Sequence, residues 1–140
     1  MTANTSPIFT LTPNIGMARL TAANTASDGS GTLGTLFTAG ANGSLVQRIR
    51  AYNSQATAAA SSDMVTRVFV TDNAGANPRL VAEFTVPAKT RSTTVIGANY
   101  CHTFPGGGLP LASGQLLKVI QSVYAGAQDQ MDYTAEGGDF

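Results

Sequence analysis

The stretch that decides the fold is residues 64–86, which read MVTRVFVTDNAGANPRLVAEFTV. Two runs rich in β-branched and aromatic residues, 64–71 and 79–86, flank the segment DNAGANP. Such runs favour strands, whereas Asp, Asn, Gly and Pro favour the turn between them. We therefore predict a β-hairpin in which Arg67 and Glu83 pair across the two strands. Strict alternation would place Phe69 on the face opposite Val68.

The same period of two continues along most of the chain. Further runs that favour strands are residues 6–12, 15–21, 33–38, 45–52, 92–100, 115–124 and 130–136. Segments rich in Gly, Asn, Ser and Pro separate them, at 24–34, 40–43, 104–108 and 112–114. About eight or nine short strands at this spacing predict one all-β domain over residues 1–140, an antiparallel β-sandwich or jelly roll.

The N-terminal segment allows two interpretations. Residues 1–18 contain no charged side chain but several large apolar ones, and Pro13 interrupts the strand pattern. Either the segment is an extended arm that adds a strand to a neighbouring molecule, or it is an edge strand of its own sheet. At the other end, we predict that residues 137–140 form a C-terminal tail.

Charge is scarce and balanced. Only 11% of the residues are charged, and eight basic residues balance eight acidic ones. This composition argues against a nucleic-acid partner or an electrostatic membrane anchor, and it favours association with other protein surfaces. The chain also contains no long apolar run and no apparent secretory leader, and its single Cys101 excludes an internal disulfide.

Residues that could carry chemistry are few, and we predict neither a catalytic site nor a cofactor. Cys101 and His102 form the one thiol–imidazole combination, but neighbours in a strand point to opposite faces. The glycines at 106–108 resemble a phosphate-binding loop only superficially, because no Lys-Ser or Lys-Thr follows them.

Two polar clusters and the tyrosines are the remaining candidate binding features. The acidic residues Asp129, Asp132, Glu136 and Asp139 do not match a calcium loop, so we expect solvated charge and no metal. A basic stripe of Arg48, Arg50 and Arg67 on one sheet face would be ion-paired rather than bound to nucleic acid. Exposed tyrosines would suit a carbohydrate-binding module, and the candidates are Tyr52, Tyr100, Tyr124 and Tyr133.

Five stretches resemble small virion proteins of tailed bacteriophages. They are PIFTLTPNIG (7–16), FTAGANGSLVQRIR (37–50), VFVTDNAGANPRLVAEFTVPA (68–88), LPLASGQLLKV (109–119) and AEGGDF (135–140). The chain departs from the commonest form of this pattern at residues 101–104, just before GGGLPL. The resemblance carries no catalytic signature.

The resemblance implies a head decoration protein that binds the major capsid protein on the outer capsid surface and stabilises the shell. Such a protein would be made in the host cytoplasm and would form a homo-oligomer, a dimer or a trimer. A tail or neck component is the alternative, and a carbohydrate-binding host-attachment module is the alternative from another class. The residues expected at the interface are Ile8, Phe9, Leu11, Ile15, Met17, Phe104, Leu109 and Phe140.

Overall fold

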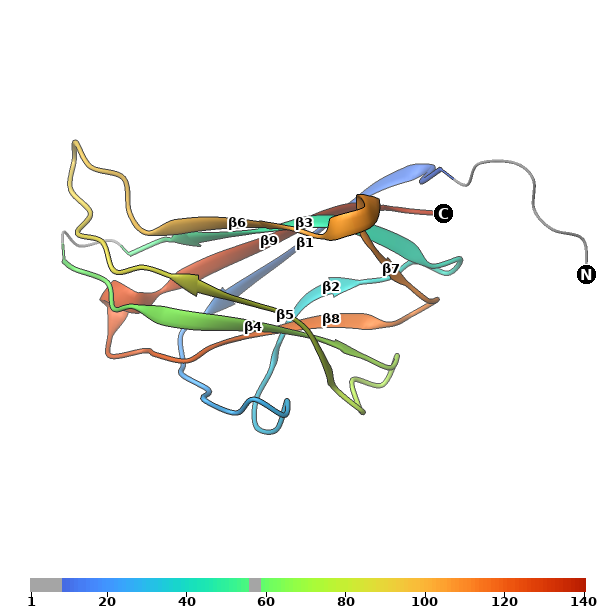
Figure 1. The fold of residues 1–140 in the computed structure, drawn as a ribbon, viewed down its shortest axis with the longest axis horizontal. Coiled ribbons are helices and arrows are strands. Elements are labelled where there is room, and N and C mark those ends of the chain that lie inside the picture. The colour runs from blue at the N-terminus through green and yellow to red at the C-terminus, as the bar shows by residue number, and fades with distance from the viewer. Residues whose placement is uncertain (1–8, 56–58) are drawn as a thin grey trace, which may run out of the picture.

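The protein consists of two antiparallel sheets packed face to face (Figure 1), in a computed structural model that describes residues 9–55 and 59–140. The prediction of an all-β sandwich is confirmed. The strands are β1 (Thr12–Leu20), β2 (Gly34–Thr38), β3 (Ser44–Asn53), β4 (Met64–Thr71), β5 (Arg79–Val86), β6 (Asn99–Thr103), β7 (Leu109–Leu111), β8 (Leu116–Gln121) and β9 (Met131–Asp139). Two 3-10 turns, η1 (Pro105–Gly107) and η2 (Ala127–Asp129), complete the described elements.

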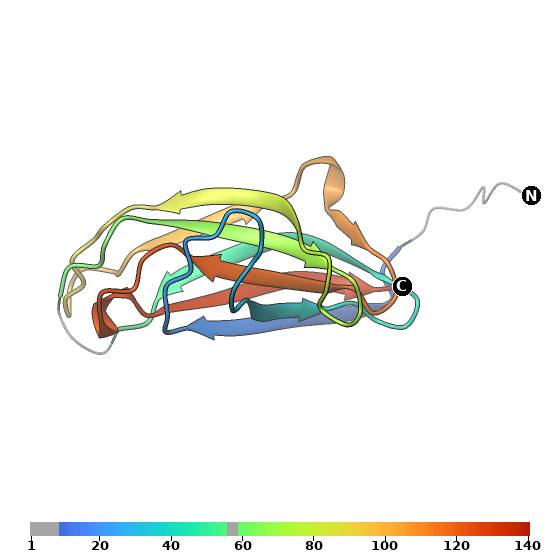
Figure 2. The ribbon, with the colours of Figure 1, turned by 90° about the horizontal axis from the view of Figure 1, so that it is seen from below.

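The strand order is that of a jelly roll. Sheet A has the order β1-β9-β3-β6, with the short β7 beside β3, and sheet B has the order β2-β8-β4-β5. Apart from β7 and the β4–β5 hairpin, each strand is followed along the chain by a strand of the other sheet. The long strands lie roughly lengthwise in both layers (Figure 2). Of the two architectures that the sequence predicts, the topology therefore matches the jelly roll.

The core lies between the sheets and is formed by alternate residues of their strands. Phe37, Ile49 and Leu117 are at most 1% exposed. The predicted β4–β5 hairpin is present, with Arg67 opposite Glu83. Its alternation holds, because Val68 belongs to the core between the sheets, whereas Phe69 lies on the outer face of sheet B, where it is buried beside Gly29 of the chain segment that follows β1. The bulge of this hairpin lies in β5, where Val81 is the extra residue between Leu80 and Ala82, the partners of Phe69 and Val68.

Strand β1 is an edge strand of its own sheet. Residues 12–20 pair with β9 along their whole length, so this part of the N-terminal segment forms an edge strand of sheet A. Of the two short strands predicted on either side of Pro13, the second is observed as β1 and begins earlier than predicted, whereas residues 9–11 of the first lie outside any strand and residues 6–8 lie outside the described residues. An edge position tolerates proline because one side of the strand needs no backbone donor. Within the described chain, no helix is long and apolar enough to cross a membrane.

The edge strands β1 and β2 approach each other at Gly16. A Cβ atom on this residue would lie 1.9 Å from the carbonyl oxygen of Leu36, so only glycine fits. Beside this contact, the side chain of Asn14 donates a hydrogen bond to the Thr38 carbonyl oxygen at 3.2 Å. Together these contacts hold the open edge of sheet A against the edge of sheet B.

The predicted C-terminal tail is wrong, because β9 continues through Asp139. Gly137 permits this, since a Cβ there would lie 2.2 Å from the Leu45 carbonyl oxygen of β3. The Asp139 carboxylate then accepts hydrogen bonds from Asn14 of β1, at 2.9 Å, and from the Ser44 hydroxyl of β3. These bonds lower the pKa of Asp139. One carboxylate thus links three strands of sheet A.

The strand predicted over residues 92–100 is displaced along the chain. The observed strand, β6, begins at Asn99 and ends at Thr103. Residues 92–98 instead form a loop, in which the Ser92 hydroxyl accepts hydrogen bonds from the backbone N–H groups of Thr94 and Val95. A side chain that satisfies local backbone donors competes with the backbone hydrogen bonds of a sheet. Here the local bonds to Ser92 hold these residues in a loop, although several of them are β-branched.

The outer faces of the two sheets differ in what covers them. The segment between β1 and β2, residues 21–33, lies beneath sheet B (Figure 1). It is tied there by the Asn24 N–H, which donates to the Gln121 carbonyl oxygen, and by Arg67, which donates to the Thr25 carbonyl oxygen. Ile120 of sheet B is consequently only 2% exposed. Along β1, by contrast, outward side chains of sheet A remain in solvent.

We expect Gly16→Ala to lower the free energy of unfolding by about 2–3 kcal/mol, because the new methyl group would meet backbone atoms of β2 that cannot rotate away. Chemical denaturation monitored by circular dichroism would measure the loss. Gly126→Ala is the control, because its Cβ would mainly meet the flexible end of the Gln128 side chain. Equal stability of the Gly16 variant and the wild type would contradict the close approach of β1 and β2.

The Asp139 linkage predicts acid sensitivity. Because its pKa is lowered in the folded state, the stabilisation is complete above the unfolded pKa of about 4 and is lost as the pH falls through the folded value. Asp139→Asn should cost about 1–2 kcal/mol at pH 7 and progressively less in acid. Thermal melts between pH 7 and pH 2 would show this convergence. Parallel curves for the variant and the wild type would exclude the linkage.

Candidate functional site

The outer face of sheet A presents three rows of side chains that cross four strands. The pairing registers of β1, β9, β3 and β6 place partner residues side by side. The rows are Ile15–Glu136–Arg48–Thr103, Met17–Thr134–Arg50–Cys101 and Arg19–Asp132–Tyr52–Asn99. This face combines apolar, aromatic and charged groups that come from both ends of the chain.

Ion pairs neutralise most of the charge in these rows. Arg19 binds Asp132 through two hydrogen bonds of 2.6 and 2.9 Å. The hydrogen bond from Arg19 lowers the pKa of Asp132. Glu136 lies between Arg48 and Arg50, with Nε–O distances of 2.5 and 2.8 Å. Exposed pairs of this kind contribute only about 0–1 kcal/mol each, so their main effect is to hold the long side chains in place.

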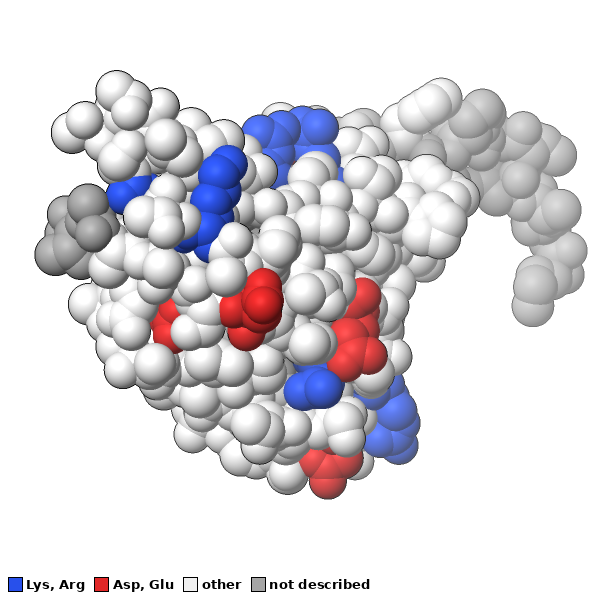
Figure 3. Space-filling view, turned by 60° about the vertical axis from the view of Figure 1, so that its left-hand side comes forward, with Lys and Arg blue, Asp and Glu red and all other residues white. Residues whose placement is uncertain are grey.

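An exposed apolar strip, here called the β1 patch, lies at the start of the described chain. Phe9, Leu11, Ile15 and Met17 are 72, 82, 59 and 75% exposed. Next to it, a shallow hollow of about 390 Å³ is bounded by Met17, Arg19 and Thr134 among others. Charge is sparse elsewhere too, and Figure 3 shows isolated basic and acidic groups separated by broad uncharged surface. Contiguous exposed apolar residues mark an interaction surface.

The remaining predicted interface residues do not join this patch. Phe104 is 6% exposed and belongs to the core, so its assignment to an interface is wrong. Leu109 is partly buried against the same core. Phe140 is half-buried, and its N–H donates to the Gly43 carbonyl oxygen. Ile8 lies outside the described residues.

Cys101 and His102 leave β6 on opposite faces. Cys101 is exposed and lies opposite Arg50, on the outer face. His102 stacks on Phe84 of β5, with ring centroids 5.6 Å apart, and meets Phe104 edge-on at 4.9 Å. Burial lowers the pKa of His102. Its position is that of an aromatic spacer that closes the sandwich between β6 and β5.

The expectation of solvated acidic charge is wrong for Asp129. This residue is fully buried, and its carboxylate accepts hydrogen bonds from the Ser62 N–H, the Ser62 hydroxyl and the Ala125 N–H at 2.7–3.1 Å. It therefore organises the loops at one end of the sandwich. Over residues 9–55 and 59–140, no three His, Cys, Asp or Glu side chains are grouped as metal ligands.

The basic stripe is divided between the two sheets. Arg48 and Arg50 lie on sheet A, whereas Arg67 belongs to β4 of sheet B. The predicted pairing of Arg67 with Glu83 is confirmed, with an Nε–Oε1 distance of 2.8 Å. The prediction of a single basic face is therefore wrong, although all three arginines are ion-paired as predicted.

Tyr52, Tyr100 and Tyr133 form no shared platform. Tyr133 is buried, and its hydroxyl lies 2.9 Å from that of Thr66. Burial raises the pKa of Tyr133 to about 12. Tyr100 stacks on Phe84 at 4.8 Å, on the side of β6 that faces sheet B. Tyr52 alone stands on the outer face of sheet A, where it is 49% exposed.

No protein-family model matches this chain, and a search of curated proteins finds no match for it either.

Proposed function

We propose that this chain is a structural protein of a larger particle, and specifically a decoration protein on the outer surface of a bacteriophage head. The observation that carries the proposal is the β1 patch, with Ile15 and Met17 exposed on an uncovered sheet face of a protein with no net charge. The sequence resemblance is the reason for proposing a bacteriophage head as the particle, and the β1 patch is the surface that would contact it.

The geometry favours docking through the face of sheet A over the addition of a strand to its edge. At Gly16 the edge of β1 lies against β2, so an incoming strand would meet β2 there. The charges of the face beside it are already paired. A partner that covered this face would bury Ile15 and Met17 without leaving an unpaired carboxylate. Burial of apolar area at this point is the favourable contribution to binding.

Many copies on a symmetric shell would make weak contacts sufficient. Burial of a small patch offsets only part of the entropy that a molecule loses on binding. When copies contact both the shell and one another, the effective concentration raises the overall affinity without new contacts at each site. The mechanism is mechanical, because each bound copy bridges adjacent capsid subunits and resists their separation.

A tail or neck component would use the same surface, and location separates the two. Quantitative mass spectrometry of purified particles, after heads and tails have been separated on a gradient, tests both location and copy number. A copy number in heads comparable to that of the shell protein supports decoration. Enrichment in the tail fraction would replace this proposal with the tail alternative.

We expect Met17→Glu to abolish co-sedimentation with heads that lack the protein, because the variant places an unpaired charge in the contact. The fold should survive, since the side chain is 75% exposed. Leu80→Glu makes a similar change on β5 of sheet B, where the side chain is 45% exposed, and should bind as the wild type does. Binding of the Met17 variant at wild-type affinity would remove the β1 patch from the interface.

A further inference from the structure

A second surface feature lies at the end of sheet A where β3 stops and the loop 91–98 returns to β6. It is a pocket of about 350 Å³, lined by Tyr52, Asn53, Arg91, Ile96, Gly97, Ala98 and Asn99. A larger pocket of about 610 Å³ lies beside the 21–33 segment, but its Arg19 is already bound to Asp132. The smaller pocket differs from it because its charged side chain, Arg91, is held by backbone carbonyl oxygens and not by a carboxylate.

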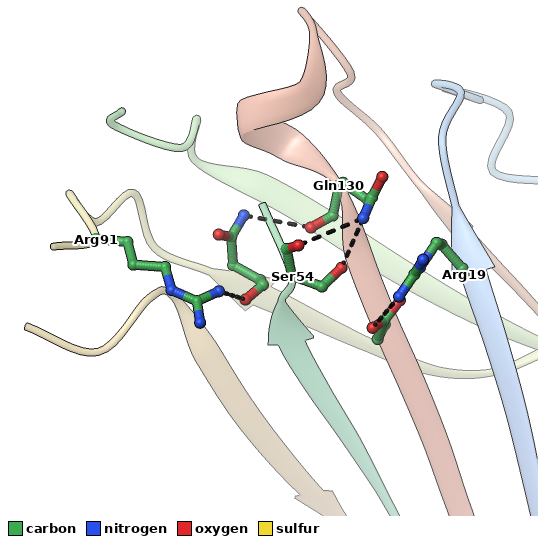
Figure 4. A network of polar contacts seen from close by, with 6 residues as sticks. Arg19, Ser54, Arg91 and Gln130 are labelled. Atoms are coloured by element: carbon green, nitrogen blue, oxygen red, sulfur yellow. Dashed lines mark hydrogen bonds and ion pairs between the residues drawn. The ribbon is translucent and has the colours of Figure 1, made fainter. Parts of the chain in front are cut away.

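Arg91 is held by the backbone and not by a carboxylate. Its Nη1 atom donates to the carbonyl oxygen of Asn53 at 3.1 Å (Figure 4). It also donates to the carbonyl oxygen of Gln55 at 3.3 Å. Among the residues that the structure describes, no acidic group lies within ion-pair distance of it, whereas Arg19, Arg48, Arg50 and Arg67 all have one. Arg91 is also the one charged residue among those lining the pocket.

A half-buried guanidinium without a counterion is suited to an anion. The two carbonyl oxygens fix one nitrogen, so the planar group is oriented before a ligand arrives. The polar network that holds β3 beside β9 steadies this end of the sheet, because Gln130 donates to the carbonyl and hydroxyl oxygens of Ser54 (Figure 4). Guanidinium groups recognise carboxylates through paired hydrogen bonds, which are stronger than neutral ones.

The other walls supply a ring, an apolar side chain and amide groups. Tyr52 is 49% exposed and Ile96 is 69% exposed. The exposed Asn99 donates its amide N–H to the Gly97 carbonyl oxygen at 3.1 Å, which orients its side chain.

We infer that this pocket binds a saccharide that carries a carboxylate, such as a uronic acid unit. The carboxylate would pair with Arg91, the apolar face of the sugar ring would stack on Tyr52, and its hydroxyl groups would bond to Asn99. An acidic peptide also offers a carboxylate, but an aromatic ring beside oriented amides suits a sugar ring better. The inference does not depend on the decoration role, because β9 and β3 separate the pocket from β1.

The test is to titrate the full chain with trigalacturonic acid and to monitor binding by NMR and calorimetry. Maltotriose serves as the neutral trisaccharide control. We expect saturable binding of trigalacturonic acid, at least about tenfold weaker binding of maltotriose, and shifts confined to the residues lining the pocket. Arg91→Gln should weaken binding about ten- to a hundredfold. Arg79→Gln removes the same charge from an exposed residue of β5 and should leave binding unchanged.

A second pair of variants keeps the test decisive if Arg91→Gln unfolds the chain. Tyr52→Phe keeps the ring and should bind as the wild type does, whereas Tyr52→Ala should lose at least about tenfold in affinity. Met17→Glu should bind the saccharide normally, which separates this site from the β1 patch. The inference is overturned by absence of saturable binding, by equal losses in the Arg91 and Arg79 variants, or by tighter binding of a hexaglutamate peptide at the same residues.

Discussion

The pairing of β9 with both β1 and β3 is the constraint on which the rest of the structure depends. It joins the last strand of the chain to the first and aligns the three outer rows of sheet A. The pairing is possible only because Gly137 lets β9 approach the backbone of β3. Asp139 then bonds to both neighbouring strands. Contacts between such distant segments carry a high loop-closure cost, so the outer face of sheet A forms only when the whole chain is folded.

The features of the fold that could be predicted from the sequence are those that local interactions determine. The hairpin at 64–86 and its Arg67–Glu83 pair could be predicted because both depend on neighbours in sequence and on a turn between them. The bulge at Val81 could not, because nothing in the local sequence marks the residue that is left out of the pairing between β4 and β5. Likewise, Gly137 and its neighbours have the composition of a flexible tail, yet the absence of side chains is what admits them to the centre of a sheet.

The candidate sites were predicted less completely because they depend on which residues become neighbours. Ile15 and Met17 could be singled out as apolar residues in an uncharged segment, and they are exposed. Phe104 has the same character in sequence but is buried, since only the tertiary fold decides which apolar residues face outward. Arg91 gave no signal, because nothing local distinguishes an arginine with a carboxylate partner from one held by backbone carbonyl oxygens.

The scarcity of charge gives each unpaired group more weight than it would have on an ordinary surface. On a strongly charged protein, Arg91 would be one cation among many. Here four of the eight basic residues are committed to carboxylates within the described chain, and the face that carries the β1 patch is nearly neutral. Neutral rows suit a contact that must tolerate many neighbouring copies, whereas an oriented cation beside a tyrosine suits a small anionic ligand. Under the two proposals, one jelly roll uses the β1 side of the sheet A face for assembly and the β6 side for recognition, because different strands build the two surfaces.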